Sequence, residues 1–206
     1  MKPENEILVN KQKDILSFRD LAEGTISIYI SYLSMFIAWV EAELPGKSVM
    51  DITWEEIRSY VDYLRNVRSI GNRTVNVHIA QLHHFWHYVL KRDWDKYEVP
   101  FLRYDTSLPV VPTVNEINAI INSIVNIKHK AEIALLYSSG IRVSELCRLH
   151  CGDILMSKGC ILISRSKNRS ERYAVLSQKA LAILIEYIRK AYPHAAPDDW
   201  LFPGQT

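Results

Sequence analysis

The sequence has few residues that cross-link a chain or break its helices: three cysteines and seven glycines among 206 residues. Cys147, Cys151 and Cys160 are odd in number and follow no export signal, so we expect reduced thiols and no disulfide framework. The N-terminus lacks the basic flank and apolar stretch of a signal peptide, and no run approaches the roughly 18 apolar residues that span a bilayer. These absences exclude a secreted disulfide scaffold and predict a cytoplasmic protein with no membrane partner.

Internal repeats and low-complexity tracts are also missing, while a hydrophobic content of 48% is enough for one large core or two small ones. The net charge is only +2, but the charges are unevenly spread. Residues 1–62 carry eleven acidic side chains, whereas residues 65–92 carry none, and a second basic stretch spans residues 164–173. Local basic patches suit a polyanion such as DNA, and the alternative is an ordinary solvated surface.

Apolar spacing of threes and fours predicts helices in the first half of the chain. One covers residues 25–44 and ends at Pro45-Gly46, and a second begins after Thr53, where Glu56 can complete a capping box. A third begins near Asn72 and buries an apolar face that includes Trp86. Together they predict a helical domain over residues 1–98.

Three prolines interrupt the pattern after this domain and predict a linker over residues 99–112. Beyond it we expect helices from Thr113 to about Ser123, over 129–139, after Gly140 and over 178–191. Two short β-like runs, "CILIS" and "RYAVL", flank a basic loop and predict a hairpin, and "WLFPG" could be a short strand or turn. The expected fold is mainly α with a small antiparallel β-sheet, in which residues 113–206 form an α+β domain.

The segment "LLYSSGIRVSELCRL" places Arg142 and Glu145 at positions i and i+3 of a helix that follows Gly140. At that spacing the carboxylate can hold the guanidinium in a fixed orientation. An arginine near a helix N-terminus attracts phosphate, because unpaired amides and the helix dipole favour an anion there. Such a pair is more often a simple surface ion pair, so the order of the surrounding motifs carries the argument.

That order resembles the tyrosine recombinases of the phage integrase family over nearly the whole chain. "YSSGIRVSELCRL" is similar to the first arginine motif of the family, T-G-L-R-x-S-E-L, and "SKNRSERYAVL" is similar to its hairpin motif, G-K-G-x-K-x-R-x-V-P-L. "TVNVHIAQLHHFWHYV" resembles a motif of the family's helical, SAM-like core-binding domain. Members of this family have two domains that clamp duplex DNA, which agrees with the expected linker.

The resemblance implies a role for each matched residue. Arg142 would stabilise charge on the scissile phosphate, Glu145 would be its acidic companion, and Lys167 would protonate the leaving 5′ oxygen. No metal or cofactor is implied, since arginines supply the positive charge. Double-stranded DNA is the implied partner, together with self-association or another recombinase on the DNA. The residues expected to contact DNA are Arg73, Thr74, Asn76, His78, His83, Lys91, Arg92, Arg165, Arg169 and Arg172.

The sequence departs from the family where the H-x-x-R motif and the nucleophilic tyrosine are expected. Tyr173, Tyr187 and Tyr192 precede the expected position of that nucleophile and are better explained by packing. We therefore expect either a truncated recombinase that is inactive in cleavage alone, or a non-catalytic DNA-binding module that accompanies an intact recombinase. A scaffold with no role on DNA is a third, weaker alternative.

Two further clusters are better explained without a ligand. His83 and His87, like Cys147 and Cys151, have the i,i+4 spacing of zinc ligands, but no third and fourth ligand follow at suitable spacing. The aromatic run around Trp86 continues an apolar helix face, so we expect it in the core and not in a base-stacking platform.

Overall fold

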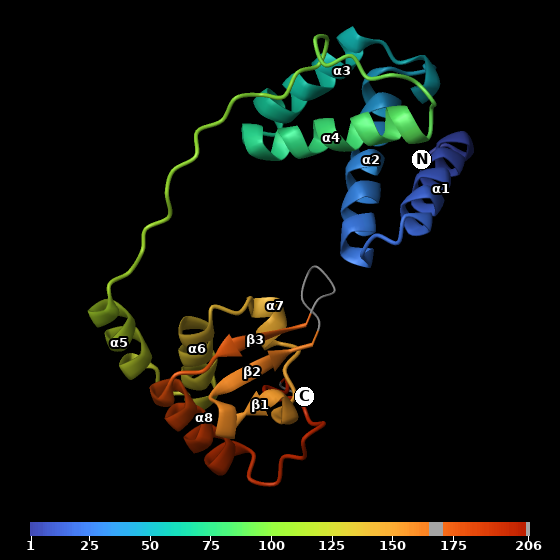
Figure 1. Ribbon diagram of the computed structural model, residues 1–206. Helices are drawn as coiled ribbons and strands as arrows, with labels where there is room; N and C mark the ends of the chain where they lie inside the picture. The colour runs from blue at the N-terminus through green and yellow to red at the C-terminus, as the bar shows by residue number, and fades with distance from the viewer. Residues whose placement is uncertain (165–170, 205–206) are drawn as a thin grey trace. The chain divides into compact units, whose positions relative to one another are not determined.

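The computed structural model describes residues 1–164 and 171–204 and divides into two compact units, Met1–Leu108 and Pro109–Thr206. The fold is mostly helical with one small antiparallel sheet, as the sequence predicts (Figure 1). The predicted hairpin loop, residues 165–170, lies outside the described residues. Each unit is considered by itself below.

The N-terminal unit consists of helices (Figure 1). They pack around one hydrophobic core. Thr53 accepts a hydrogen bond from the backbone N–H of Glu56, while the Glu56 carboxylate accepts one from the backbone N–H of Thr53, so the predicted capping box is confirmed. The described elements are α1 Pro3–Phe18, α2 Glu23–Glu43, the 3-10 turn Val49–Asp51, α3 Trp54–Asp62, the π-helical turn Tyr63–Val67 and α4 Asn72–Tyr88.

The core of this unit forms where α2, α3 and α4 meet. Phe36 and Trp86 are fully or nearly fully buried, and their ring centroids lie 6.1 Å apart in an edge-to-face arrangement. Phe85 is also buried, which confirms that this part of the aromatic run belongs to the core. The packed helices therefore leave only one face of α4 free for other contacts.

Two elements of the N-terminal unit differ from the sequence-based expectation. Helix α1 was not predicted, because its apolar residues are interrupted by charges and it buries only Asn5, Gln12 and Leu16. Helix α2 is long and apolar enough to cross a membrane by length and composition, so the statement that no segment approaches this limit is wrong. Its buried stripe, which includes Leu33 and Ile37, packs in the core of the unit.

The segment that follows α4 begins as part of the N-terminal unit. The Asn76 side chain accepts a hydrogen bond from the Leu102 backbone N–H at 2.7 Å and donates one to the Leu102 carbonyl at 2.8 Å. Asn72 donates a further hydrogen bond to the Arg103 carbonyl. The first residues after Val99 are therefore hydrogen-bonded to α4, and Asn76 makes two of these bonds.

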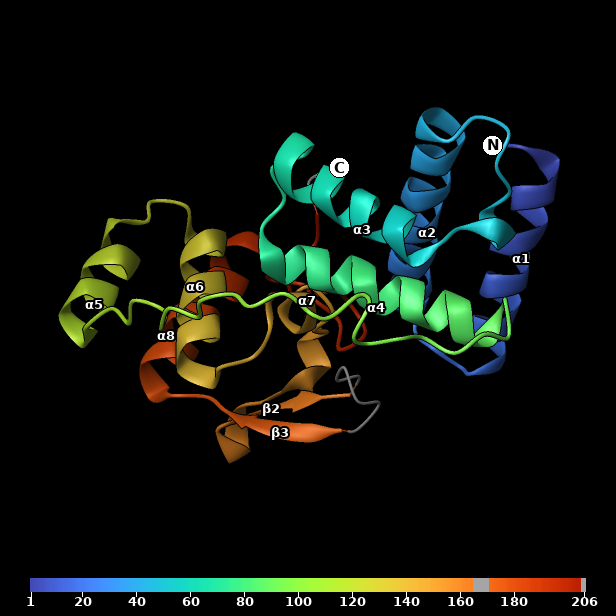
Figure 2. The same cartoon turned by 90° about the horizontal axis from the view of Figure 1, so that it is seen from above.

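The C-terminal unit is a three-stranded antiparallel sheet, in the order β1-β2-β3, with α6 and α8 packed on one face (Figures 1 and 2). Strand β1 was not predicted, because Ile154–Leu155 is only two residues long. Segment 199–201 pairs with 149–151 through an isolated bridge between Trp200 and His150. The described elements are α5 Val114–Ser123, α6 Ile127–Ser139, α7 Val143–Leu146, β1 Ile154–Leu155, β2 Cys160–Ile163, β3 Arg172–Val175 and α8 Gln178–Ala191, with 3-10 turns at Cys151–Asp153 and Met156–Lys158.

Candidate functional site

The site begins at Gly140, which ends α6 in the left-handed conformation with φ of 62°. Glycine adopts this conformation without a Cβ penalty, so the chain can reverse directly into α7. Arg142 is the N-cap residue of α7, which has only four residues. Arg142 therefore lies at the N-terminal end of a helix, as predicted, and the attraction of a phosphate to this end stays a prediction.

Glu145 is the centre of the site, since it is 5% exposed and binds two arginines. Its Oε1 accepts a hydrogen bond from Arg142 Nη1 at 2.9 Å, and its Oε2 accepts one from the Arg142 backbone N–H at 2.8 Å. Arg172 Nη2 donates a third hydrogen bond to Oε2, also at 2.8 Å. We call Arg142, Glu145 and Arg172 the Glu145 cluster. The predicted pairing of Arg142 with Glu145 is present, and Arg172 joins it from β3.

Strand alternation explains why Arg172 reaches Glu145. Successive side chains of a strand point to opposite faces, so Arg172 and Ala174 share the face that packs on the helices. Tyr173 and Val175 point to the other face and are 66% and 72% exposed. The sequence reading assigned Arg172 to DNA. The structure shows that it bonds a buried carboxylate, which its place on the same strand face as Ala174 could have indicated, and the DNA contact stays a prediction.

The Glu145 cluster favours an ionised carboxylate. Burial raises the pKa of Glu145, but the hydrogen bonds from Arg142 and the charges of Arg172 and Arg142 outweigh burial and hold the pKa below its ordinary value. The Arg142 side chain is 57% exposed, so most of its guanidinium faces solvent. The site is thus an exposed cation fixed by a buried, charged acid.

A cavity of about 490 Å³ lies beside Glu145. The ring of His150 forms part of its wall and stacks on that of Trp200, with centroids 4.3 Å apart. Arg148 and the carboxyl groups of Asp153 and Glu171 also line it. The wall therefore carries polar groups of both signs next to the Glu145 cluster.

The three tyrosines considered as nucleophiles lie in unsuitable positions. Tyr173 is on the strand face opposite Arg172. Tyr187 is 2% exposed and donates to the Leu201 carbonyl at 3.0 Å, and burial raises its pKa. Burial also raises the pKa of Tyr192, followed by the effect of Asp199. Tyr187 is therefore a packing residue, as expected, whereas the interpretation of Tyr173 and Tyr192 as packing residues stays a prediction.

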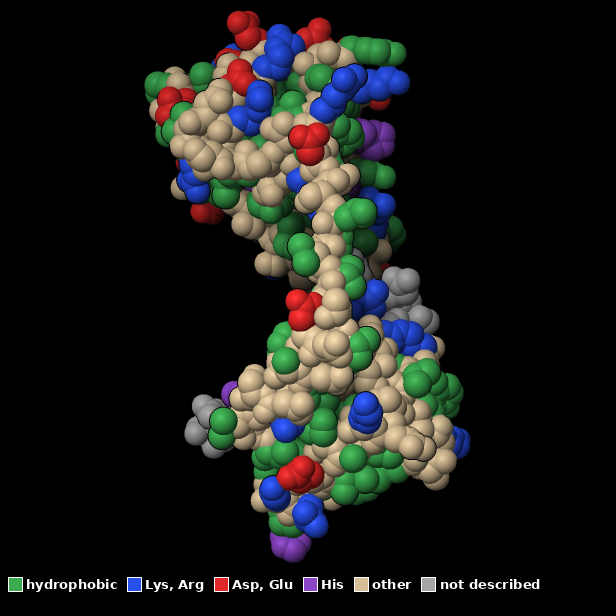
Figure 3. All heavy atoms as spheres, turned by 90° about the vertical axis from the view of Figure 1, so that its left-hand side faces the viewer, with side chains coloured by type: hydrophobic (Ala, Val, Ile, Leu, Met, Phe, Trp, Pro, Cys, Tyr) green, Lys and Arg blue, Asp and Glu red, His purple; other side chains and the backbone are tan. Residues whose placement is uncertain are grey.

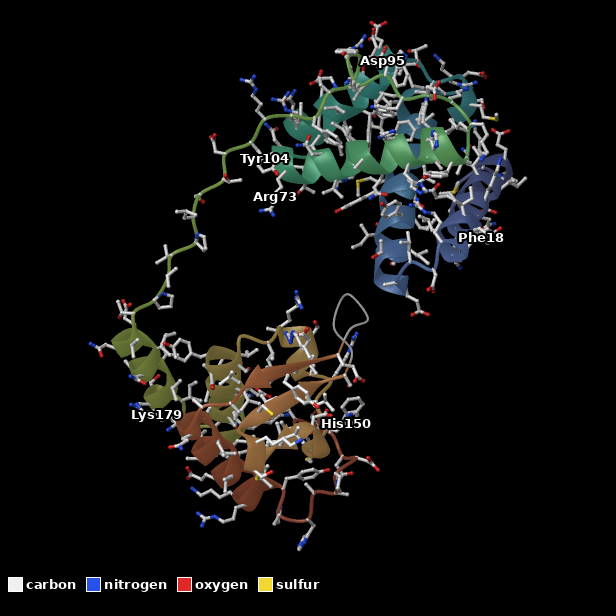
Figure 4. All side chains as sticks on the ribbon, viewed as in Figure 1. Phe18, Arg73, Asp95, Tyr104, His150 and Lys179 are labelled. Carbon is white, nitrogen blue, oxygen red and sulfur yellow. The ribbon has the colours of Figure 1, made fainter. Side chains whose placement is uncertain are left out.

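The predicted DNA contacts of the N-terminal unit fall into two groups. Arg73 and Thr74 are exposed in the first turn of α4, where Arg73 projects into solvent (Figure 4). Lys91 and Arg92 are exposed after the end of α4, and Arg92 Nη1 donates to the Met50 carbonyl at 2.6 Å. These four residues remain available to a ligand of this unit.

His78 and Asn76 correct the prediction. His78 is 2% exposed, its Nδ1 lies 3.2 Å from the Tyr60 hydroxyl, and burial lowers its pKa to about 4. A neutral, buried ring cannot contact a phosphate, so His78 is withdrawn as a DNA contact. The Asn76 amide already bonds the Leu102 backbone through both of its polar atoms, so it too serves the fold.

His83 is exposed and lies beside His84 and His87 in a hollow that Arg19 and Tyr88 also line. Burial, followed by the charge of Arg19, lowers the pKa of His84 to about 4. Among residues 1–164 and 171–204, no group of three or more His, Cys, Asp or Glu side chains is arranged to hold a metal ion.

The basic surface is also less uniform than the charge count predicts. Arg65 Nη1 lies 3.7 Å from Asp62 Oδ1, and Arg58 forms an ion pair with Glu98. On the face of the N-terminal unit in Figure 3, Lys and Arg side chains are interspersed with Asp and Glu. Three other predicted site residues, Arg165, Lys167 and Arg169, lie outside the described residues.

Two family models match the chain in the order of its units. The model of the N-terminal SAM-like domain of phage integrases matches residues 8–96, and that of the phage integrase family matches residues 112–206. Both units thus match domains of one class of protein, the phage integrases. The chain belongs to the phage integrase family of tyrosine recombinases.

Individual relatives agree with this assignment. A putative integrase/recombinase of Sinorhizobium fredii is 29% identical over 198 residues, covering 96% of this chain and 61% of the relative. Tyrosine recombinase XerD of Rickettsia prowazekii is 28% identical over 190 residues, covering 84% and 60%. The chain thus spans about three fifths of the length of these curated relatives.

Solved structures share the fold at low sequence identity. The Tn1549 transposon integrase in complex with circular intermediate DNA has a TM-score of 0.69 at 16% identity, covering 96% of this chain and 71% of that one. A lambda integrase dimer bound to a COC′ core site has a TM-score of 0.65 at 15% identity, covering 90% and 54%.

Proposed function

We propose that this chain binds duplex DNA in the cytoplasm and places Arg142 at a backbone phosphate, as the arginine part of a recombinase phosphoryl-transfer site. The observation that carries the proposal is the position of Glu145, which is buried, ionised and bonded to an arginine that is mostly exposed. An arginine oriented in this way is ready to donate hydrogen bonds to the non-bridging oxygens of a phosphodiester.

The chemistry that such a site supplies is electrostatic. When an oxygen nucleophile attacks a phosphodiester, charge grows on the non-bridging oxygens, and a fixed guanidinium stabilises it without having to reorganise. Arg142 is fixed because Glu145 holds both its backbone N–H and its Nη1. Lys167 is proposed as the general acid at the leaving oxygen, on the similarity of its motif alone.

We further propose that strand cleavage needs a tyrosine other than Tyr173, Tyr187 and Tyr192. Tyr187 is buried, and Tyr173 points away from the Glu145 cluster. The same chain could instead act as an accessory module that holds DNA or an intact recombinase. Neighbours solved on DNA, one of them as a dimer, support DNA and a second recombinase copy as partners.

Two measurements test these proposals. Fluorescence anisotropy of a labelled duplex should show binding that weakens as salt rises, because Lys and Arg contacts to phosphate displace counterions. Binding that is absent, or independent of salt, would refute the DNA proposal. A nicked suicide duplex should give no covalent adduct on a denaturing gel, and an adduct would show that this chain supplies its own nucleophile.

A further inference from the structure

The Glu145 cluster contains two guanidinium groups and one carboxylate, so its three side chains sum to one positive charge. Without Arg172, Arg142 and Glu145 would form a neutral pair with Nη1 and Oε1 2.9 Å apart. A neutral pair attracts an incoming phosphate far less than a cation does. The positive charge of the cluster therefore depends on Arg172 as much as on Arg142.

The hydrogen bonds divide the two arginines into different tasks. Oε2 of Glu145 receives the Arg142 backbone N–H and Arg172 Nη2, and these two donors fix the plane of the carboxylate. Among the described residues, Oε1 receives one N–H of the Arg142 guanidinium, which has five. Arg142 can therefore remain bonded to Glu145 and still present its other donors to a ligand.

The two arginines also differ in how far their side chains are exposed, and the difference agrees with these separate tasks. The Arg142 side chain is 57% exposed, whereas that of Arg172 is 37% exposed and its Nη1 is buried. Within the described part of the chain, this Nη1 has no hydrogen-bond partner. The guanidinium of Arg172 thus faces the interior of the unit, and that of Arg142 faces outward.

We infer that Arg172 is a positioning residue that holds the second oxygen of Glu145 and keeps the Glu145 cluster cationic, so that Arg142 can bind a DNA phosphate. The inference rests on the proposed function, because it assigns to Arg172 a role in the same site. It replaces the sequence-based assignment of Arg172 as a direct DNA contact.

The first test needs no DNA and follows the Glu145 carboxyl carbon by NMR during a pH titration of the full chain. Arg172→Met keeps an unbranched side chain without the charge, so it should raise the pKa of Glu145, whereas Arg172→Lys should leave the pKa close to that of the wild type. The adjoining cavity is lined by four other charged or titratable residues, Arg148, His150, Asp153 and Glu171. Both variants retain them, so their effects on the pKa of Glu145 cancel when the variants are compared. An unchanged Glu145 pKa in Arg172→Met, with the fold intact by circular dichroism, would overturn the inference.

The second test is a double-mutant cycle on duplex affinity. Arg142→Ala should weaken binding roughly tenfold and Arg172→Met roughly fivefold. The double variant leaves Glu145 with one net negative charge, so it should bind more weakly than Arg142→Ala alone but fall well short of the fiftyfold product, because part of the effect of Arg172 acts through Arg142. Arg172→Lys should recover most of the loss caused by Arg172→Met. Losses that multiply to roughly fiftyfold in the double variant would mean that Arg172 binds phosphate itself, and would overturn its assignment as a positioning residue.

Failure of the proposed function gives a different result from failure of the inference. If the wild type does not bind duplex DNA, the proposed function fails while the titration of Glu145 still reports whether Arg172 controls the acid. If the wild type binds and Arg172→Met binds equally well, the proposed function stands and the inference is wrong.

Discussion

Removing Glu145 should destabilise the C-terminal unit far more than removing the arginine that it orients. Glu145 is 5% exposed and accepts three hydrogen bonds of 2.8 to 2.9 Å, so Glu145→Ala leaves two guanidinium groups without their shared acid. Breaking a buried ion pair costs about 3–5 kcal/mol. Because Arg142 and Arg172 are 57% and 37% exposed, water can hydrate them again, which reduces our expectation to about 2–3 kcal/mol.

Arg142→Ala should change the free energy of unfolding by no more than about 1 kcal/mol, since Glu145 keeps the backbone N–H and Arg172. Urea unfolding can be followed by hydrogen exchange of peptides from α6 and α8, which pack together in this unit and report it alone. The exposed acid Asp198 provides a matched control, and Asp198→Ala should have almost no effect. Equal losses in Glu145→Ala and Arg142→Ala would refute the assignment of Glu145 as the organising residue.

Three further predictions concern other parts of the structure. The unfolded chain protonates His78 below about pH 6.5 but the folded chain only near pH 4, so this residue contributes stability above pH 6.5 that is lost as the pH falls toward 4. His84 shares this shift, so the free energy of unfolding in urea should fall between pH 7 and pH 5, and His78→Gln should reduce that fall by about 2 kcal/mol without abolishing it. Asn76→Ala should speed limited proteolysis near Leu102, because two hydrogen bonds of 2.7 and 2.8 Å are lost, whereas Thr74→Ala on the same helix should not. Leu135→Ala should cost about 3 kcal/mol in urea unfolding, and Ile133→Ala, which starts 37% exposed, well under half of that.

The sequence was sufficient to predict the strongly periodic elements. Helices α2 and α4 carry continuous apolar faces, and the Thr53 capping box and the cap at Thr113 mark where α3 and α5 begin. Helix α1 could not be found in this way, because much of its surface is polar and packing against α2 stabilises it.

The candidate site was only partly predictable. The i,i+3 spacing is enough to place Glu145 beside Arg142, since neighbours on one turn must meet. Arg172 lies 27 residues from Glu145, and only the register of Ile163 opposite Arg172 brings it within reach. His78 was wrongly predicted to contact DNA because a histidine on a helix can face the core as easily as solvent. In the structure it faces the core, where its Nδ1 lies beside the Tyr60 hydroxyl.

The most direct measurement is the salt dependence of duplex binding by the wild type and two arginine variants. If Arg142 binds a DNA phosphate, Arg142→Ala should lower the slope of log K against log salt by about 0.9. Arg189→Ala removes an exposed arginine from the last turn of α8, outside the Glu145 cluster, and should keep the wild-type slope. An unchanged slope in Arg142→Ala, or an equal fall in both variants, would contradict the assignment of Arg142 to DNA.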